Sequence, residues 1–414
     1  MKLYEDKENP WPGWFAASGV ESRELLAPQR GEQMKKFLLV VVYGAVLGAL
    51  VGAASGLFLR FLYEGIHFVW YTLPELTGLS GLELTLYPLG LGLPGGLLVG
   101  LSHHFLGDHP KLLDETIAEF QETKRIAYKY LPQGMITAAV PLFFGASLGP
   151  EAALVDLTGG LGTWASDQLK RAGQRLGLLA KAPDAAEWSR PQAWALIAGA
   201  AITGLLALVL VVSDLFGAGF LDTASYQAQW LDLAYAILPG LVGTIAGLLF
   251  LEFLTLSEHL TQALDDKPIW RSLPGGLVLG ILAMIFPLVR FSGQHEMQVL
   301  RDGFVQMGFW SLLLLGASKL FLTAFLIKTG WKGGQFLPIM FSSVAVGLAV
   351  GLVFPAIPPA VAMVAAMAAA TTVVVGKPVA VLPLMLLMFS VKLVGAKPST
   401  TLPRVDEGEA CEIH

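Results

Sequence analysis

Glycine and proline interrupt the long apolar runs of this chain, which recur from residue 37 to residue 395. Of its 414 residues, 54% are hydrophobic and only 14% are charged, a composition typical of a polytopic helical membrane protein. Several runs are too short to cross a hydrocarbon core of about 30 Å as straight helices. We therefore predict an all-α polytopic membrane protein in which some helices are discontinuous and end inside the bilayer.

The charge pattern and the motifs that are missing exclude several other classes of protein. The formal net charge of −5 is small, and no basic face of the kind found in nucleic-acid-binding proteins is present. Cys411 is the only cysteine, which excludes an intramolecular disulfide and a multi-cysteine metal site. The sequence contains no zinc-protease motif and no P-loop. We expect no enzymatic activity, no cofactor, no metal and no nucleic-acid partner.

The first informative break is the stretch Gly-Ala-Ser-Leu-Gly-Pro-Glu at 145–151, which starts an apolar run with a glutamate. A charged side chain inside a membrane helix costs roughly 2.5–3.5 kcal/mol, so it usually faces water, a partner or a helix N-terminus. Pro150 suits a first helical turn because it has no N–H. Glu151 would then lie beside the unpaired N–H groups and the positive dipole end of that turn. Taken alone, the motif is equally compatible with a plain acidic cap.

The second break is Gly-Gly-Gln-Phe-Leu-Pro at 333–338, and it also opens an apolar run. The two glycines let the backbone approach an ion or another helix, and Pro338 fits the start of the helix that follows. The N–H groups of Gln335, Phe336 and Leu337 would then point into the membrane interior. A Gly-Gly turn before proline is by itself only a turn. Two such helix starts in one chain, one of them carrying Glu151, predict an anion pathway.

The distribution of lysine and arginine predicts the orientation of the spans. Basic residues are dense in the segment 166–190 and also precede the first span, so both regions are expected in the cytoplasm. We assign residues 1–34 to a cytosolic N-terminal segment, 35–396 to the transmembrane domain and 397–414 to a short polar tail. The first segment lacks the pattern of a signal peptide. We expect a multi-pass protein of the plasma (inner) membrane with a cytoplasmic N-terminus.

At the two breaks the chain resembles the CLC family of chloride channels and chloride/proton antiporters, whose motifs are written GSGIP, G(K/R)EGP and GxFxP. Residues 334–338, Gly-Gln-Phe-Leu-Pro, fit the third motif completely. Residues 149–153 match the second motif in part, with Glu151 at the family's gating glutamate. The resemblance implies a divergent prokaryotic-type member without regulatory domains. It also implies a homodimer whose subunits each contain two inverted halves, about 37–216 and 232–395, that meet at the anion site.

Under this resemblance Glu151 is both the gate and a proton acceptor, because its ionised carboxylate competes with the transported anion for backbone N–H groups. The anion-binding positions at the two helix starts are Gly149, Pro150, Ala152, Gln335, Phe336 and Leu337. Antiport needs a second, inward titratable group, for which Asp214 is a weak candidate, since a residue at the water interface would look the same. Lys319, inside the run 309–328, either attracts anions or extends toward the interface.

The chain departs from the family where GSGIP is expected, because it has Gly107-Asp108-His109-Pro110 there. Superposing the prolines puts the anion-coordinating serine on Gly107, and a shift of one residue puts it on Asp108. An ionised aspartate repels an anion, whereas a serine hydroxyl donates to it.

Two functions therefore stay open. One is transport of a small inorganic anion such as chloride, through a channel or an anion/proton antiporter. The other is secondary transport of a different solute, an organic anion or a cation, with Asp108 in its site.

Overall fold

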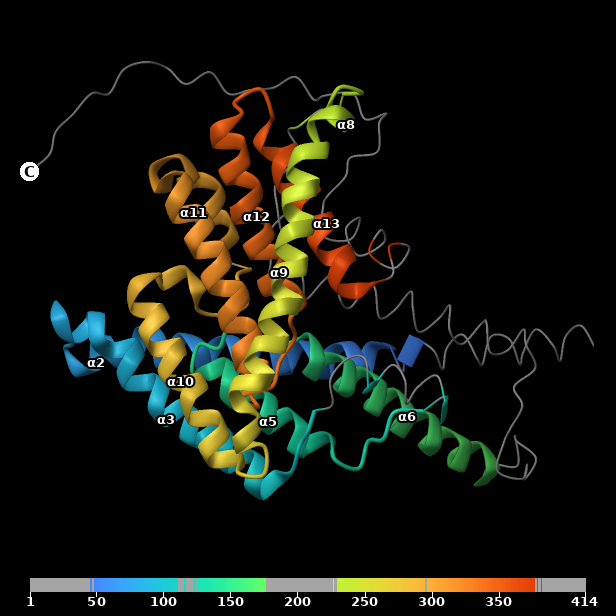
Figure 1. Ribbon diagram of the computed structural model, residues 1–414. Coiled ribbons are helices and arrows are strands. Elements are labelled where there is room, and N and C mark those ends of the chain that lie inside the picture. Colours follow the sequence, from blue (N-terminus) through green and yellow to red (C-terminus); the bar gives the residue numbers. More distant parts are fainter. Residues whose placement is uncertain are drawn as a thin grey trace, which may run out of the picture. The chain divides into compact units, whose positions relative to one another are not determined.

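A computed structural model describes residues 45–46, 48–110, 115–116, 122–123, 125–175, 226, 229–294, 296–376, 378 and 381 (Figure 1). The chain divides into two compact units: Met1–Ala53 with Leu169–Ala207, and Ala54–Gln168 with Leu208–His414. Every contact discussed below lies within the second unit. Asp214, the predicted inner proton acceptor, lies outside the described residues.

The described residues form helices, and the only extended pairing among them is one isolated bridge. In chain order the α-helices are α2 (Leu73–Thr77), α3 (Leu82–Leu106), α5 (Leu131–Phe143), α6 (Glu151–Arg175), α8 (Asp232–Tyr235), α9 (Ile237–Thr261), α10 (Pro268–Ile285), α11 (Glu296–Lys328), α12 (Phe336–Val353) and α13 (Pro359–Val375). Short turns of other helix types are η2 (Phe68–Thr72), η3 (Gln262–Leu264) and η4 (Pro287–Val289). The predicted all-α class is confirmed.

Six described segments are long and apolar enough to cross a membrane: Gly48–Thr77, Leu82–Leu106, Asp232–Leu264, Pro268–Ile285, Glu296–Lys328 and Phe336–Val353. The apolar helices α5 and α13 are shorter. The 13 residues of α5 rise only about 20 Å, less than the hydrocarbon thickness. The chain is an integral membrane protein that combines full spans with partial ones.

Small residues bring the backbones of α3 and α10 into contact, and Figure 1 shows these two helices side by side. A Cβ on Gly92 of α3 would overlap the carbonyl oxygen of Gly276 on α10, and a Cβ on Gly276 would overlap Gly92. One turn away, the Ser272 hydroxyl donates to the carbonyl oxygen of Gly96 across 2.6 Å. Close approach of glycines and a shared hydrogen bond are the means by which helices associate in lipid.

The helices α11 and α12 form the centre of the core. Every residue of α12 from Leu337 to Val350 is buried, and α12 packs against α9, α11 and α13. The helix α11 is kinked at Gly308, whose φ is 75°. The kink falls immediately before 309, where the sequence predicts that an apolar run begins. The second break, 333–338, comprises the end of the linker 329–335 between these two helices and the first turn of α12.

Lys319 lies on α11 and is fully buried. Its ammonium donates to four consecutive carbonyl oxygens, those of Leu288, Val289, Arg290 and Phe291, at 3.0–3.1 Å. It also lies 4.5 Å from the centre of the Phe341 ring. Lys319 therefore neither reaches the interface nor faces an open vestibule. The N–H of Phe291 in turn donates to the Gly145 carbonyl oxygen at 3.1 Å, so this lysine holds the segment that supports the first break.

Candidate anion site

The structure brings the two glycine breaks into direct contact. Gly149 and Gly334 form an antiparallel bridge, in which each N–H donates to the other residue's carbonyl oxygen, at 2.8 and 2.6 Å. A Cβ on either glycine would overlap the carboxylate of Glu151. The two glycines thus form a narrow slot that fits the glutamate because neither wall carries a side chain.

Glu151 is the first residue of α6 and its side chain lies on the start of α12. Its Oε1 accepts a hydrogen bond from the N–H of Leu337 at 3.1 Å, one of the N–H groups that a helix leaves unpaired in its first turn. The other oxygen, Oε2, is buried and has no hydrogen-bond partner among the residues that the structure describes. A carboxylate in this position is an anion tethered to the chain and bound at a helix N-terminus.

The other predicted positions lie around Glu151 and Leu337. Gln335 is the N-cap of α12 and Phe336 its first residue. The Pro150 carbonyl oxygen accepts from the N–H of Leu154 at 2.9 Å, so Pro150 lies directly before the first residue of α6 and accepts a hydrogen bond from its first turn. Ala152 is buried, with 6% of its surface exposed. The structure therefore gathers the six helix-start positions and Glu151 in one region.

A buried hydroxyl pair fixes the loop that precedes Glu151. Ser147 and Thr323 are both fully buried, and their hydroxyl oxygens lie 3.0 Å apart. The Thr323 hydroxyl also lies 3.0 Å from the Ser147 carbonyl oxygen, which it can donate to. Thr323 is one helical turn after Lys319 on α11. One face of α11 therefore contacts both the loop before Glu151 and the segment 288–291, which supports that loop.

The segment Gly107-Asp108, where the family motif GSGIP is expected, is built differently from that motif. Gly107 caps α3 by donating its N–H to the His103 carbonyl oxygen at 3.0 Å. Its φ of +88° favours glycine over serine. Asp108 does not present an unpaired charge: its Oδ1 lies 2.8 Å from Lys332 Nζ and 3.3 Å from His103 Nδ1. The hydrogen bond from His103 and the charge of Lys332 hold the pKa of Asp108 well below its usual range.

Lys332 is the residue that reasoning from the sequence missed. It lies in the linker between α11 and α12, two residues before Gly334. The available signal was a cation in a short glycine-rich break between two apolar helices, which needs an anionic partner or water. Its partner could not be read from the sequence because Asp108 lies in the other half of the chain.

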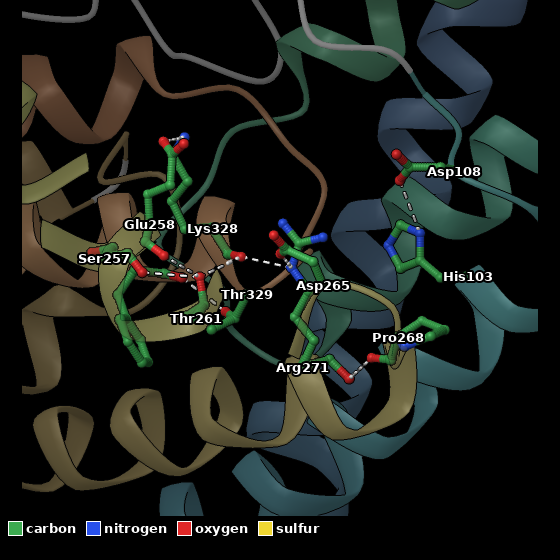
Figure 2. A network of polar contacts seen from close by, with 12 residues as sticks. His103, Asp108, Ser257, Glu258, Thr261, Asp265, Pro268, Arg271, Lys328 and Thr329 are labelled. Carbon is green, nitrogen blue, oxygen red and sulfur yellow. Dashed lines mark hydrogen bonds and ion pairs between the residues drawn. The ribbon is translucent and has the colours of Figure 1, made fainter. Parts of the chain in front are cut away.

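A network of polar contacts fixes the end of α11 where this linker begins. Figure 2 shows Glu258, Thr261 and Arg271 close to Lys328. The Lys328 carbonyl oxygen accepts from Arg271 Nε at 2.8 Å and from the Thr261 hydroxyl at 3.4 Å. The carbonyl groups that a helix leaves unpaired at its end are thus partly satisfied by neighbouring helices. The linker starts from a fixed point.

A family model for the voltage-gated chloride channel matches residues 184–396. This range covers about half of the chain and contains the helices α9 to α13 together with the second break. The chain belongs to this family. The match begins after Glu151, so the family model does not cover this glutamate.

Relatives and solved structures agree with the family assignment. The chain is 26% identical over 348 residues to the chloride channel protein CLC-f of Arabidopsis thaliana, covering 73% of this chain and 44% of the plant protein. It is 26% identical over 304 residues to the putative ion-transport protein YfeO of Salmonella schwarzengrund, covering 68% of this chain and 72% of that protein. The CLC chain thus spans less than half the length of its plant relative.

The fold is shared with solved CLC structures. A slow cyanobacterial Cl⁻/H⁺ antiporter matches with a TM-score of 0.63 at 19% identity, over 84% of this chain and 89% of the antiporter. A CLC-type fluoride/proton antiporter matches with a TM-score of 0.58 at 18% identity, over 85% of this chain and 90% of the antiporter. At such low identity these matches show a common CLC fold.

Proposed function

We propose that this CLC-family protein moves a small inorganic anion, chloride or a similar halide, across the membrane through a pathway gated by Glu151. The observation that carries the proposal is the hydrogen bond from the Leu337 N–H to Glu151 Oε1 at 3.1 Å. A helix N-terminus is a ready anion site. The glutamate therefore takes the position in which a free anion would bind.

Protonation of Glu151 is the switching event in this mechanism. The ionised carboxylate competes with the anion for the N–H groups of Gln335, Phe336 and Leu337. A proton on Oε2, the oxygen without a described partner, removes the negative charge and weakens the hold on Leu337, because hydrogen bonds to charged acceptors are the stronger ones. The neutral side chain can leave the glycine slot, and the transported anion takes its place.

The nature of the anion is supported by the relatives. The plant relative is called a chloride channel, and the matched structures are chloride/proton and fluoride/proton antiporters. Small monovalent anions fit a slot whose walls are two glycines. The protein is an antiporter if protons move with the anion and a channel if they do not. For an antiporter, we propose Asp214 as the inner proton acceptor.

The alternative function, transport of another solute at Asp108, loses its main support. That alternative has Asp108 as part of the site for the other solute. The carboxylate instead pairs with Lys332 at 2.8 Å and with His103 at 3.3 Å. The charge of Asp108 is thereby offset, which makes this segment compatible with an anion.

The wider setting follows from family membership. We propose a homodimer with one pathway in each subunit, located in the plasma membrane with its N-terminus in the cytoplasm. The transmembrane domain is residues 35–396, with halves 37–216 and 232–395, between the cytosolic segment 1–34 and the tail 397–414.

The test is anion efflux from proteoliposomes that contain the full chain, with chloride, fluoride, bromide or nitrate inside and with external pH recorded at the same time. We expect efflux that changes with pH in the wild type and is independent of pH in Glu151→Gln. Glu252→Gln, which alters an exposed glutamate on α9, is the matched control and should behave as wild type. Stoichiometric proton movement identifies an antiporter, and its absence identifies a channel.

Two outcomes would contradict the proposal. Unchanged pH dependence in Glu151→Gln would remove the glutamate from the gate. Efflux of none of the four anions would favour transport of a different solute.

A further inference from the structure

A groove beside the packed helices α3 and α10 lies next to the turn that joins two membrane spans. The spans Asp232–Leu264 and Pro268–Ile285 leave residues 265–267 between them, so this turn lies at the membrane surface. The groove has a volume of about 520 Å³, which is within the range of about 300–1,000 Å³ for small-molecule sites. Its lining includes residues of α3, η3, the turn and α10: Leu93, Leu264, Lys267, Trp270, Leu273 and Leu277.

The lining combines apolar walls with a single cation. Lys267 is the one charged residue among those that line the groove. It is exposed, and none of the ion pairs among the described residues includes it. Of the two acidic neighbours, Asp265 pairs with Arg271 at 3.5 Å, and the exposed Asp266 does not line the groove. A ligand that fits here has an apolar tail and an anionic head.

An anionic phospholipid has both of these parts at the right depth. Its acyl chains lie in the hydrocarbon layer, where Leu277 is exposed on α10. Its phosphate lies at the membrane surface, as Lys267 does. Trp270, 64% exposed, is of the residue type enriched at this boundary. Basic pockets between membrane helices bind the headgroups of anionic lipids, whereas a zwitterionic lipid carries a cation that offsets the attraction to lysine.

The start of α10 also holds the linker that leads to the second break. The groove-lining residues of α10 share one helical face, and Arg271 and Ser272 lie on another. Arg271 Nε donates to the Lys328 carbonyl oxygen at 2.8 Å (Figure 2). The indole N–H of Trp331 donates to the Ser272 carbonyl oxygen at 3.0 Å. Trp331 is three residues before Gly334, so the first turns of α10 connect the groove with the Glu151 slot.

We propose that this groove binds one anionic phospholipid, with an acyl chain against Leu93, Leu273 and Leu277 and its phosphate on Lys267. The bound lipid restricts the movement of the first turns of α10 and thereby supports the linker behind them. The proposal gives the protein a lipid ligand in addition to the transported anion. Anion efflux should therefore be faster in membranes that contain this lipid.

The first experiment measures lipid binding to the delipidated full-length protein by native mass spectrometry. The ligands are phosphatidylglycerol, phosphatidylcholine with the same acyl chains, and soluble glycerol phosphate. We expect tighter binding of phosphatidylglycerol than of the other two, and Lys267→Gln should weaken that binding about fivefold. Leu277→Trp, which fills the groove, should also weaken it. Lys129→Gln is the matched control, since Lys129 is another exposed lysine, beside Tyr130, and should bind as wild type.

The second experiment compares chloride efflux from phosphatidylcholine proteoliposomes prepared with and without phosphatidylglycerol. A negatively charged membrane changes the local anion concentration for every variant, so Lys267→Gln is compared with Lys129→Gln in the same membranes. We expect phosphatidylglycerol to accelerate efflux in Lys129→Gln and in the wild type, but not in Lys267→Gln. Equal acceleration in both variants would overturn the link between the groove and the linker.

Three results of the binding experiment would overturn the lipid site. Equal binding of phosphatidylglycerol and phosphatidylcholine would remove the role of charge, and unchanged binding in Lys267→Gln would remove the role of this lysine. Binding of glycerol phosphate as tight as that of the lipid would make the ligand a free phosphate. A changed oligomeric state of Leu277→Trp in size-exclusion chromatography would make the occupant a second copy of the chain. If Leu277→Trp does not fold, Leu277→Phe replaces it. Lipid binding is measured without anion transport, so the two proposals fail separately.

Discussion

Glu151 and Asp108 are two carboxylates held on positive positions near the same linker, but by different means. Glu151 is bound by a backbone N–H, and its slot is formed by two glycines. Asp108 is bound by two side chains and is largely exposed. A site made of backbone depends on space and on the scaffold behind it, whereas a site made of side chains depends on charge. Substitutions that add volume should therefore disturb the Glu151 position, whereas substitutions that remove charge should disturb the Asp108 position.

The largest expected effect concerns the scaffold of the Glu151 slot. Lys319→Met leaves four carbonyl oxygens without this donor, in one buried contact and three partly buried ones. Buried groups that lose a partner cost about 1–3 kcal/mol each, so we expect a loss of stability of more than about 3 kcal/mol. Thermal unfolding in detergent, followed by tryptophan fluorescence, measures this effect. Lys328→Met on the same helix is the control, since it breaks only an ion pair with the exposed Glu258, and exposed ion pairs contribute little to stability. Equal losses would contradict the comparison.

A smaller but specific effect is expected at the slot itself. In Gly334→Ala the added methyl group overlaps the Glu151 carboxylate, so the side chain can no longer reach the Leu337 N–H. We expect pH-independent efflux, as in Glu151→Gln, from a protein that still folds. Gly162→Ala is the matched control, because it lies on α6 with open space around the position of its Cβ. Retained pH dependence in Gly334→Ala would show that the slot is wider than the structure indicates.

The smallest expected effect is the absence of a titration at Asp108. Its pKa is lowered from an ordinary value of 3.8, first by the hydrogen bond from His103 and then by Lys332. A group with a lowered pKa stays ionised above its ordinary pKa and becomes protonated only as the pH falls through the lower value. Infrared difference spectra between about pH 6 and about pH 3 should therefore contain no protonated-carboxyl band that Asp108→Asn removes, whereas an aspartate with the ordinary pKa of 3.8 would give one. Loss of such a band would mean that Asp108 is not held by its two partners.

Much of the fold and part of the site could be predicted from the sequence. The apolar runs gave the helices, and the proline and glycine positions gave the starts of α6 and α12. These helix starts depend on local chemistry, which the sequence states directly. The meeting of the two breaks was instead implied by the resemblance to the CLC family, whose two halves meet at the anion site.

The remaining features depend on tertiary contacts. The four carbonyl oxygens around Lys319 come from η4 and the residues after it, and only packing shows that they converge on one ammonium group. The pairing of Asp108 with Lys332 joins segments far apart in the chain. The same holds for Ser147 and Thr323, two ordinary hydroxyl residues whose burial and mutual contact no local pattern indicates.

The bridge between Gly149 and Gly334 has a consequence for how transport can proceed. Carriers with repeated halves often work by rocking one half against the other around a central site. Here two backbone hydrogen bonds fasten the early and late helices together at the centre itself, and rocking would have to break both of them in every cycle. Movement of a few side chains would leave the bridge intact. The bridge therefore holds the two backbone segments in a fixed position, and it favours a transport cycle in which only side chains move.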